Sequence, residues 1–169
     1  LKSANEFQMA ESAFLAGELE KALTKIEASI ALNPEVARSH ILKGRILAEM
    51  NRLTDALACF QKGQEFEPDN VDALYYQGII RERVQENDEA LALYQRAPAI
   101  RTGIGDTTGL GYTHYGIALA HWTWGDAASA LASFEQALSL WRRQNNIAGQ
   151  ADVLNATGLA LMSLGETAR

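Results

Sequence analysis

The stretch "NRLTDALACFQKGQEFEP" (Asn51–Pro68) decides how this 169-residue chain folds, because the chain carries its pattern more than once. The stretch "GELEKALTKIEASIALNP" (Gly17–Pro34) has the same order of Ala, a large apolar residue, a small residue and Pro, 34 positions upstream. The stretch "QENDEALALYQRA" (Gln85–Ala97) repeats the first three of these residues 34 positions downstream. Repetition at this period indicates a fold built from stacked helical units.

Each of these segments reads as the second helix (helix B) of a unit, and a first helix (helix A) precedes it. A small residue lies near the middle of every helix A, first at spacings of 34 residues and then of 40: Ala10, Gly44, Gly78, Ala118 and Gly158. We expect the two helices of a unit to cross closely there, since only Gly or Ala leaves room. Pro lacks the N–H that continues a helix, so Pro34 and Pro68 should follow the ends of their helices.

This pattern resembles the tetratricopeptide repeat family, whose units are helix–turn–helix pairs of 34 residues. The resemblance implies an all-α fold, a right-handed α-solenoid, formed as a single domain. Its repeats would cover residues 3–36, 37–70, 71–110 and 111–150, with a partial repeat over 151–169. The chain opens with Leu1 and stops where a fifth helix B should begin, so we expect a fragment of a longer chain. Its last helix would then lack a cap, which opens a route to homo-oligomers.

Composition excludes several classes of function. A net charge of −6 without clustered Lys and Arg argues against a nucleic-acid partner. No apolar run approaches the roughly 20 residues of a membrane span, so we expect no membrane insertion. Cys59 is the single cysteine and rules out an intrachain disulfide, which favours a cytoplasmic location.

The glycine-rich stretch "RTGIGDTTGLG" (Arg101–Gly111) is either a phosphate cradle or a joint between units. A phosphate loop of the Walker type needs Lys followed by Ser or Thr, and no such pair follows these glycines. In the 40-residue register Asp106 matches Asn146 and Gly109 matches Gly149, which favours a joint. We interpret it as a pliable seam between the first three units and the rest. Pro98, just upstream, should kink or end its helix.

Other candidate sites lack the groups that their chemistry needs. His114 and His121 share one helix face, but a tetrahedral zinc site needs further ligands, so we expect packing residues there. Cys59 could act as a nucleophile only with a base and an orienting group, and His40 is the single candidate base. We therefore predict no catalytic residue, no metal and no cofactor, and a protein that is not an enzyme.

The family resemblance also implies a concave groove lined by fixed positions of each helix A. Carried onto this sequence, the groove candidates are Phe7, Phe14, Arg38, Ile41, Arg45, Tyr75, Ile79, Tyr112, Tyr115, Leu119 and Trp122. The clamp that some members use for acidic C-terminal tails is absent, because Phe7, Glu11, Leu42 and Asp72 occupy its positions.

The groove candidates predict a non-catalytic scaffold that binds a protein or peptide segment. Tyr75, Tyr112, Tyr115 and Trp122 are the expected hot spots, because rigid aromatic side chains dominate interface energies. Two alternatives stay open: a regulatory or substrate-recruiting arm of a larger enzyme, and a self-assembling module.

Overall fold

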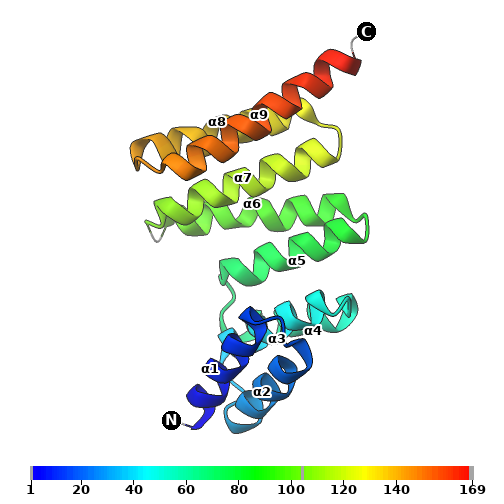
Figure 1. The fold of residues 1–169 in the computed structure, drawn as a ribbon, viewed down its shortest axis with the longest axis vertical. Helices are drawn as coiled ribbons and strands as arrows, with labels where there is room; N and C mark the ends of the chain where they lie inside the picture. The colour runs from blue at the N-terminus through cyan, green and yellow to red at the C-terminus, as the bar shows by residue number, and fades with distance from the viewer. Residues whose placement is uncertain (1, 104, 168–169) are drawn as a thin grey trace. The chain divides into compact units, whose positions relative to one another are not determined.

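The computed structural model describes residues 2–103 and 105–167, and within these ranges it contains nine α-helices and no strand (Figure 1). The helices are α1 (Lys2–Leu15), α2 (Leu19–Leu32), α3 (Ala37–Glu49), α4 (Leu53–Phe66), α5 (Val71–Arg83), α6 (Asn87–Gly103), α7 (Thr107–Thr123), α8 (Ala127–Arg143) and α9 (Ile147–Thr167). The predicted all-α class is confirmed. In repeat terms the odd-numbered helices are helices A and the even-numbered ones are helices B.

The chain divides into two compact units, Leu1–Val84 and Gln85–Arg169. The division falls between α5 and α6, inside the third predicted repeat. The division does not fall at Arg101–Gly111, and the pliability predicted for that stretch stays a prediction. The expectation of a single solenoid domain over the whole chain stays a prediction.

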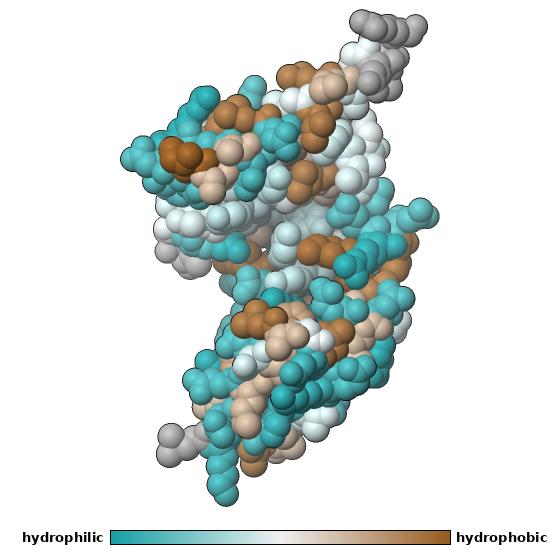
Figure 2. Space-filling model, viewed as in Figure 1, coloured by the Kyte–Doolittle hydropathy of each residue, from teal (hydrophilic) through white to brown (hydrophobic). Residues whose placement is uncertain are grey.

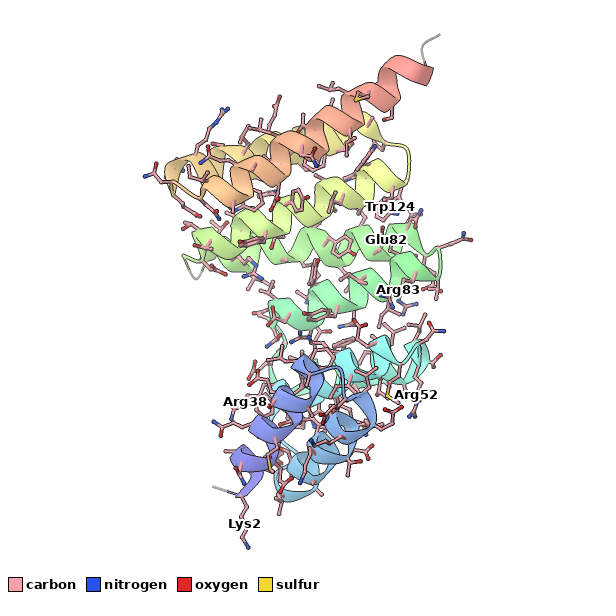
Figure 3. The ribbon with its side chains drawn as sticks, in the orientation of Figure 1. Lys2, Arg38, Arg52, Glu82, Arg83 and Trp124 are labelled. Atoms are coloured by element: carbon pink, nitrogen blue, oxygen red, sulfur yellow. The ribbon has the colours of Figure 1, made fainter. Side chains whose placement is uncertain are left out.

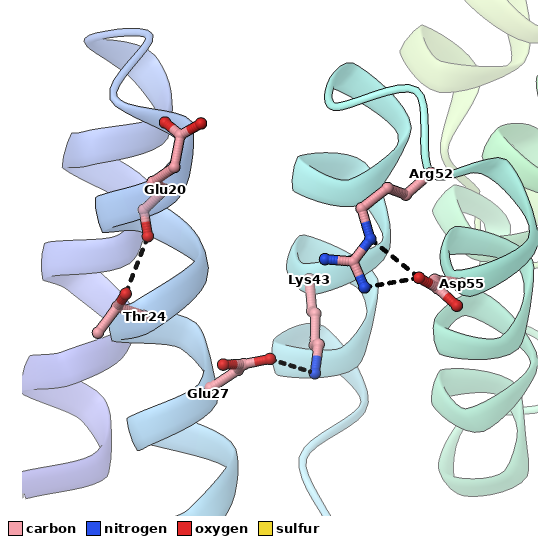
Figure 4. Close-up of polar contacts among 6 residues, drawn as sticks. All are labelled: Glu20, Thr24, Glu27, Lys43, Arg52 and Asp55. Carbon is pink, nitrogen blue, oxygen red and sulfur yellow. Dashed lines mark hydrogen bonds and ion pairs between the residues drawn. The ribbon is translucent and has the colours of Figure 1, made fainter.

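In the first unit, small residues set the contact between the helices of a repeat. A Cβ added to Gly44 of α3 would lie 2.7 Å from the Phe60 ring of α4, and both residues are buried. Ala10 of α1 and Ile26 of α2 share the neighbouring core cluster in the same way. An ion pair of 2.8 Å between Glu27 and Lys43 joins α2 to α3 (Figure 4).

Proline acts differently at two kinds of position. Helices α2 and α4 end at Leu32 and Phe66, two residues before their prolines, as expected. Pro98 instead lies inside α6, which continues to Gly103, so it does not end the helix. One turn after Pro98, the Thr102 hydroxyl donates a hydrogen bond of 2.8 Å to the Pro98 carbonyl oxygen.

In the second unit, α7 and α8 have 17 residues each, whereas the helices of the 34-residue repeats have 13 or 14. The last turn of α8 places Trp141 in the core, where its side chain is fully buried. Glycines on two helices line the indole. A Cβ on Gly111 of α7 would lie 2.6 Å from Nε1, and one on Gly149 of α9 would lie 2.5 Å from Cδ2.

The glycine-rich stretch is mostly helical. Helix α6 runs to Gly103 and α7 begins at Thr107, and the Asp106 carboxylate accepts a hydrogen bond of 2.8 Å from the Gly109 N–H. Asn146 accepts the equivalent bond of 3.0 Å from Gly149 at the start of α9, which confirms the register of the two joints. The Gly109 N–H thus already donates to Asp106 and is not free for a phosphate. The stretch forms the joint between α6 and α7.

Candidate functional site

The most distinctive surface of the first unit pairs arginines of α3 with aromatic rings of α1. The guanidinium of Arg38 lies 4.7 Å from the centre of the Phe7 ring. Seven residues further along α3, Arg45 lies 5.0 Å from the Phe14 ring and 5.1 Å from the Tyr76 ring of α5. Residues seven apart share one helix face, so both arginines present their charge along the same side of α3. We call these five residues the arginine–aromatic surface.

A small cavity adjoins each arginine. The cavity beside Arg45 has a volume of about 150 Å³ and is lined by Phe14, Arg45, Ala48, Glu49, Tyr76, Ile79, Ile80 and Arg83. The cavity beside Arg38 has a volume of about 160 Å³ and is lined by Ser3, Ala4, Phe7, Ser29, Asn33, Val36, Arg38 and Ser39. Arg38 and Arg83 are labelled in Figure 3, on α3 and at the end of α5. The Arg45 cavity places apolar side chains beside a positive charge, whereas the Arg38 cavity is lined largely by polar ones.

Three other groove candidates of this unit differ in exposure. Tyr75 is 37% exposed and meets the edge of Tyr76 at 5.5 Å, and Ile79 is half-buried beside the Arg45 cavity. Ile41 is 7% exposed and belongs to the core with Phe60, so its prediction as a surface residue is wrong.

Tyr76 was not among the predicted groove residues, although it completes the aromatic stack on Arg45. Burial raises the pKa of the Tyr76 hydroxyl. The nearby positive charge of Arg45 lowers it, but by less. The sequence signal was the adjacent pair Tyr75–Tyr76, of which only the first fitted the family's groove positions.

In the second unit, the aromatic candidates gather around Trp141. Tyr112 is 54% exposed and meets the indole edge-on at 5.2 Å. Tyr115 is half-buried against Trp141 and Phe134, at 5.6 and 5.8 Å, and its burial raises the pKa of its hydroxyl. Leu119 and Trp122 are also half-buried and pack on the same core. Tyr112 is therefore the one candidate here that is mainly exposed.

The two histidines of α7 do not form a metal site with other groups in the part of the chain that the structure describes. His114 is half-buried, and burial lowers its pKa. His121 lies 3.4 Å from the Asp126 carboxylate and meets Trp124 edge-on. Throughout the described ranges no three His, Cys, Asp or Glu side chains group as metal ligands would.

The Cys59 thiol does not have the environment of a nucleophile. Its pKa is raised by burial, which lowers the fraction of reactive thiolate. The predicted base, His40, is otherwise engaged: its Nε2 lies 2.7 Å from the Pro34 carbonyl oxygen and its ring stacks on Phe66.

None of the helices, over the part of the chain that the structure describes, has the length and hydropathy of a membrane crossing.

Comparison with solved structures gives all-helical relatives at low identity. The crystal structure of MamA has a TM-score of 0.72 at 17% identity, covering 85% of this chain and 81% of that chain. The TPR2B domain of yeast Sti1 in its complex with pHsp70 has a TM-score of 0.62 at 19% identity, covering 70% and 97%. The Arabidopsis OM64 TPR domain has a TM-score of 0.58 at 20% identity, covering 60% and 84%. At these identities the likeness establishes the fold.

Sequence comparison identifies the family. No curated protein sequence matches this chain significantly. Two family models, both described as tetratricopeptide repeat, match residues 7–66 and residues 70–143. The helix pairs found in both units and the spacing of their small residues agree with these matches. This chain therefore belongs to the tetratricopeptide repeat family and is a protein-interaction scaffold in that general sense.

Proposed function

We propose that the chain is a non-catalytic scaffold and that its arginine–aromatic surface binds a segment of a partner protein. The observation that carries this proposal is the position of Arg45, between two aromatic rings and at the edge of a cavity. Within the described residues, neither Arg38 nor Arg45 forms an ion pair with a carboxylate.

The chemistry of this surface selects an acidic side chain next to an apolar one. Stacking on a ring holds a guanidinium in place and contributes about 0.5–1 kcal/mol at an exposed site. A guanidinium held in this way loses less freedom when it binds a carboxylate through two hydrogen bonds. The rings supply apolar contact beside each charge, and the cavity beside Arg45 adds to it.

The other predicted groove residues are proposed as partner contacts of each unit taken by itself. In the first unit Ile79 lines the Arg45 cavity, and Tyr75 contacts the ring of Tyr76, which lines it too. In the second unit Tyr112 offers an exposed aromatic side chain. The TPR2B domain of yeast Sti1 forms a complex with pHsp70, and its likeness in fold is in keeping with a protein partner. The enzyme-arm and self-assembly alternatives stay predictions.

A selection from a random peptide library tests the proposal without a known partner. Peptides enriched on the intact chain would be synthesised, and their affinities for variants measured by fluorescence polarisation. We expect Arg45→Ala and Phe14→Ala to weaken the best peptides by about tenfold or more, since each removes part of a hot spot. Arg52→Ala is the matched control, because Arg52 is exposed and paired with Asp55 at 2.6 Å. Peptides that bind all variants equally would show that binding occurs elsewhere.

A further inference from the structure

The Arg38 cavity has buried hydroxyl groups on its inner side and exposed polar groups at its mouth. Ser29 and Ser39 line it and are 0% and 1% exposed, whereas Arg38 and Asn33 lie at the surface. Over α1, Figure 2 shows hydrophilic and apolar side chains next to one another on the surface of this unit. Because a water molecule takes roughly 30 Å³ in the liquid, a cavity of about 160 Å³ has room for a group the size of a phosphate.

Two reciprocal hydrogen bonds fix one wall of the Arg38 cavity. The Ser29 hydroxyl donates to the Ser3 carbonyl oxygen at 3.0 Å, and the Ser3 hydroxyl donates to the Ser29 carbonyl oxygen at 3.1 Å. These bonds tie the first turn of α1 to the last turn of α2. Since both hydroxyl protons are used in this pair, the donors that remain for a ligand come from other residues of the cavity.

Ser39 supplies a buried hydroxyl group without a partner. It forms no hydrogen bond through this hydroxyl with any residue that the structure describes, and the little surface that Ser39 retains faces the cavity that it lines. Buried hydroxyl groups are normally hydrogen-bonded, because burial removes them from water. The equivalent residue 34 positions later is the buried Ala73, so packing at this position does not require a hydroxyl. The Ser39 hydroxyl therefore points to a ligand that supplies an acceptor.

The start of α3 favours a ligand with negative charge. Its N-cap residue is Val36, whose side chain offers no acceptor to the first N–H groups of the helix. At the start of α7 the Asp106 carboxylate takes that place, where it accepts from the Gly109 N–H at 2.8 Å and pairs with Arg101. At α3 a guanidinium is also present, that of Arg38, but among the described residues no carboxylate pairs with it. Helix N-termini and arginines are groups that bind phosphate in proteins.

We propose that the Arg38 cavity binds the phosphate group of a phosphorylated serine or threonine in the partner segment. This inference rests on the proposed function, because the phosphate is carried by the segment that the arginine–aromatic surface binds. A phosphate group has a charge of about −1.5 to −2 and three strong acceptor oxygens. These oxygens can accept from the Arg38 guanidinium, the Ser39 hydroxyl and the Asn33 carboxamide, all of which line the cavity. A carboxylate has fewer oxygens and less charge, so a phosphate should bind more tightly here.

An array of short random peptides, each made with serine, glutamate or phosphoserine at its centre, tests the proposal on the intact chain. The best phosphoserine peptides and their serine and glutamate versions would be titrated by fluorescence polarisation. We expect phosphoserine to bind about tenfold or more tightly than serine, and more tightly than glutamate. Arg38→Ala and Ser39→Ala should reduce this preference, whereas Arg45→Ala should weaken all three versions alike. Ser39→Ala should fold, since Ala73 has the equivalent position, and Ser139→Ala on the exposed side of α8 is its matched control.

A phosphoserine preference that Arg38→Ala and Ser39→Ala reduce and that Ser139→Ala retains supports the proposal. Equal binding of phosphoserine and serine peptides overturns it, as does a preference that both cavity variants retain. The proposed function still stands in those two cases if Arg45→Ala weakens the peptides, and it fails by itself if Arg45→Ala leaves every affinity unchanged. Inorganic phosphate alone is the last probe. If it binds as tightly as the phosphoserine peptides and Arg38→Ala abolishes that binding, the cavity takes the free anion and the partner phosphate is overturned.

Discussion

Replacing Gly111 by Ala should destabilise the second unit, although the same exchange normally stabilises a helix. The added Cβ would lie 2.6 Å from Nε1 and 3.0 Å from Cδ1 of Trp141. The indole has little room to retreat, because it is fully buried and Gly149 lies against its six-membered ring. Either α7 or the indole must shift, and the core around Phe134 shifts with it.

The magnitude follows from two opposing effects. Ala gains up to about 1 kcal/mol over Gly from helix propensity. Forcing an extra methyl group into a packed core costs about 1–3 kcal/mol. The net loss should therefore be about 1 kcal/mol, which lowers the midpoint of thermal unfolding by roughly 4–8 °C for a unit of this size.

Tryptophan fluorescence reports this change selectively, because the three tryptophans of the chain, Trp122, Trp124 and Trp141, all belong to the second unit. Urea unfolding would be followed by this signal for the original chain and for two Gly→Ala variants. Gly103→Ala is the control, since Gly103 is exposed and an added Cβ meets no atom within 4 Å. We expect Gly111→Ala to lower the urea midpoint and Gly103→Ala to leave it unchanged or raise it. An unchanged or higher midpoint for Gly111→Ala would refute the packing argument.

Three further predictions concern single side chains. The pKa of Asp106 is lowered first by the Gly109 N–H, so its stabilising effect is present at neutral pH and is lost as the pH falls below about 4. Asp106→Ala should cost about 1 kcal/mol at pH 7 and less as the pH falls through the lowered pKa of Asp106, as measured by urea midpoints at a series of pH values. Tyr115→Ala should lower the thermal midpoint seen by circular dichroism by more than Tyr112→Ala does, because Tyr115 packs on the core and Tyr112 is mainly exposed. Cys59 should react with iodoacetamide more slowly than a free cysteine at pH 8, because burial raises its pKa, and urea should remove the difference.

The helix register could be predicted from sequence because it depends on small residues at a fixed spacing. Two helices can pack closely only where Ala or Gly lies at the crossing point, so these residues fix the position of helix A against helix B. Pro34 and Pro68 lie just after the ends of their helices B. Pro98 is the exception to this rule. Pro98 lies inside α6 and not after it, so a proline alone did not identify the end of that helix.

Exposure of the groove candidates could not be predicted in the same way, because it depends on what the facing helix supplies. Ile41 occupies a groove position of the family, yet it packs inward because α4 has Gly63 opposite. A Cβ on Gly63 would lie 3.0 Å from Ile41 Cγ1, so the missing side chain makes the space that Ile41 fills. Tyr115 packs toward the core because its ring contacts the buried Trp141 ring. Family positions therefore identify a helix face, and the neighbouring helix decides which residues remain on the surface.

The glycine-rich stretch is explained by the same dependence on a neighbouring helix. Arg101 in the last turn of α6 and Trp141 in the last turn of α8 are 40 residues apart, as are Gly109 and Gly149. The Arg101 side chain lies over Gly109 and pairs with Asp106, and the Trp141 ring lies over Gly149 beside the matching cap at Asn146. In both joints a long or flat side chain of helix B covers the first turn of the next helix A, and a glycine leaves room for it. Glycine at position 109 thus leaves room for the Arg101 guanidinium at this joint, as Gly149 leaves room for the Trp141 ring at the next one.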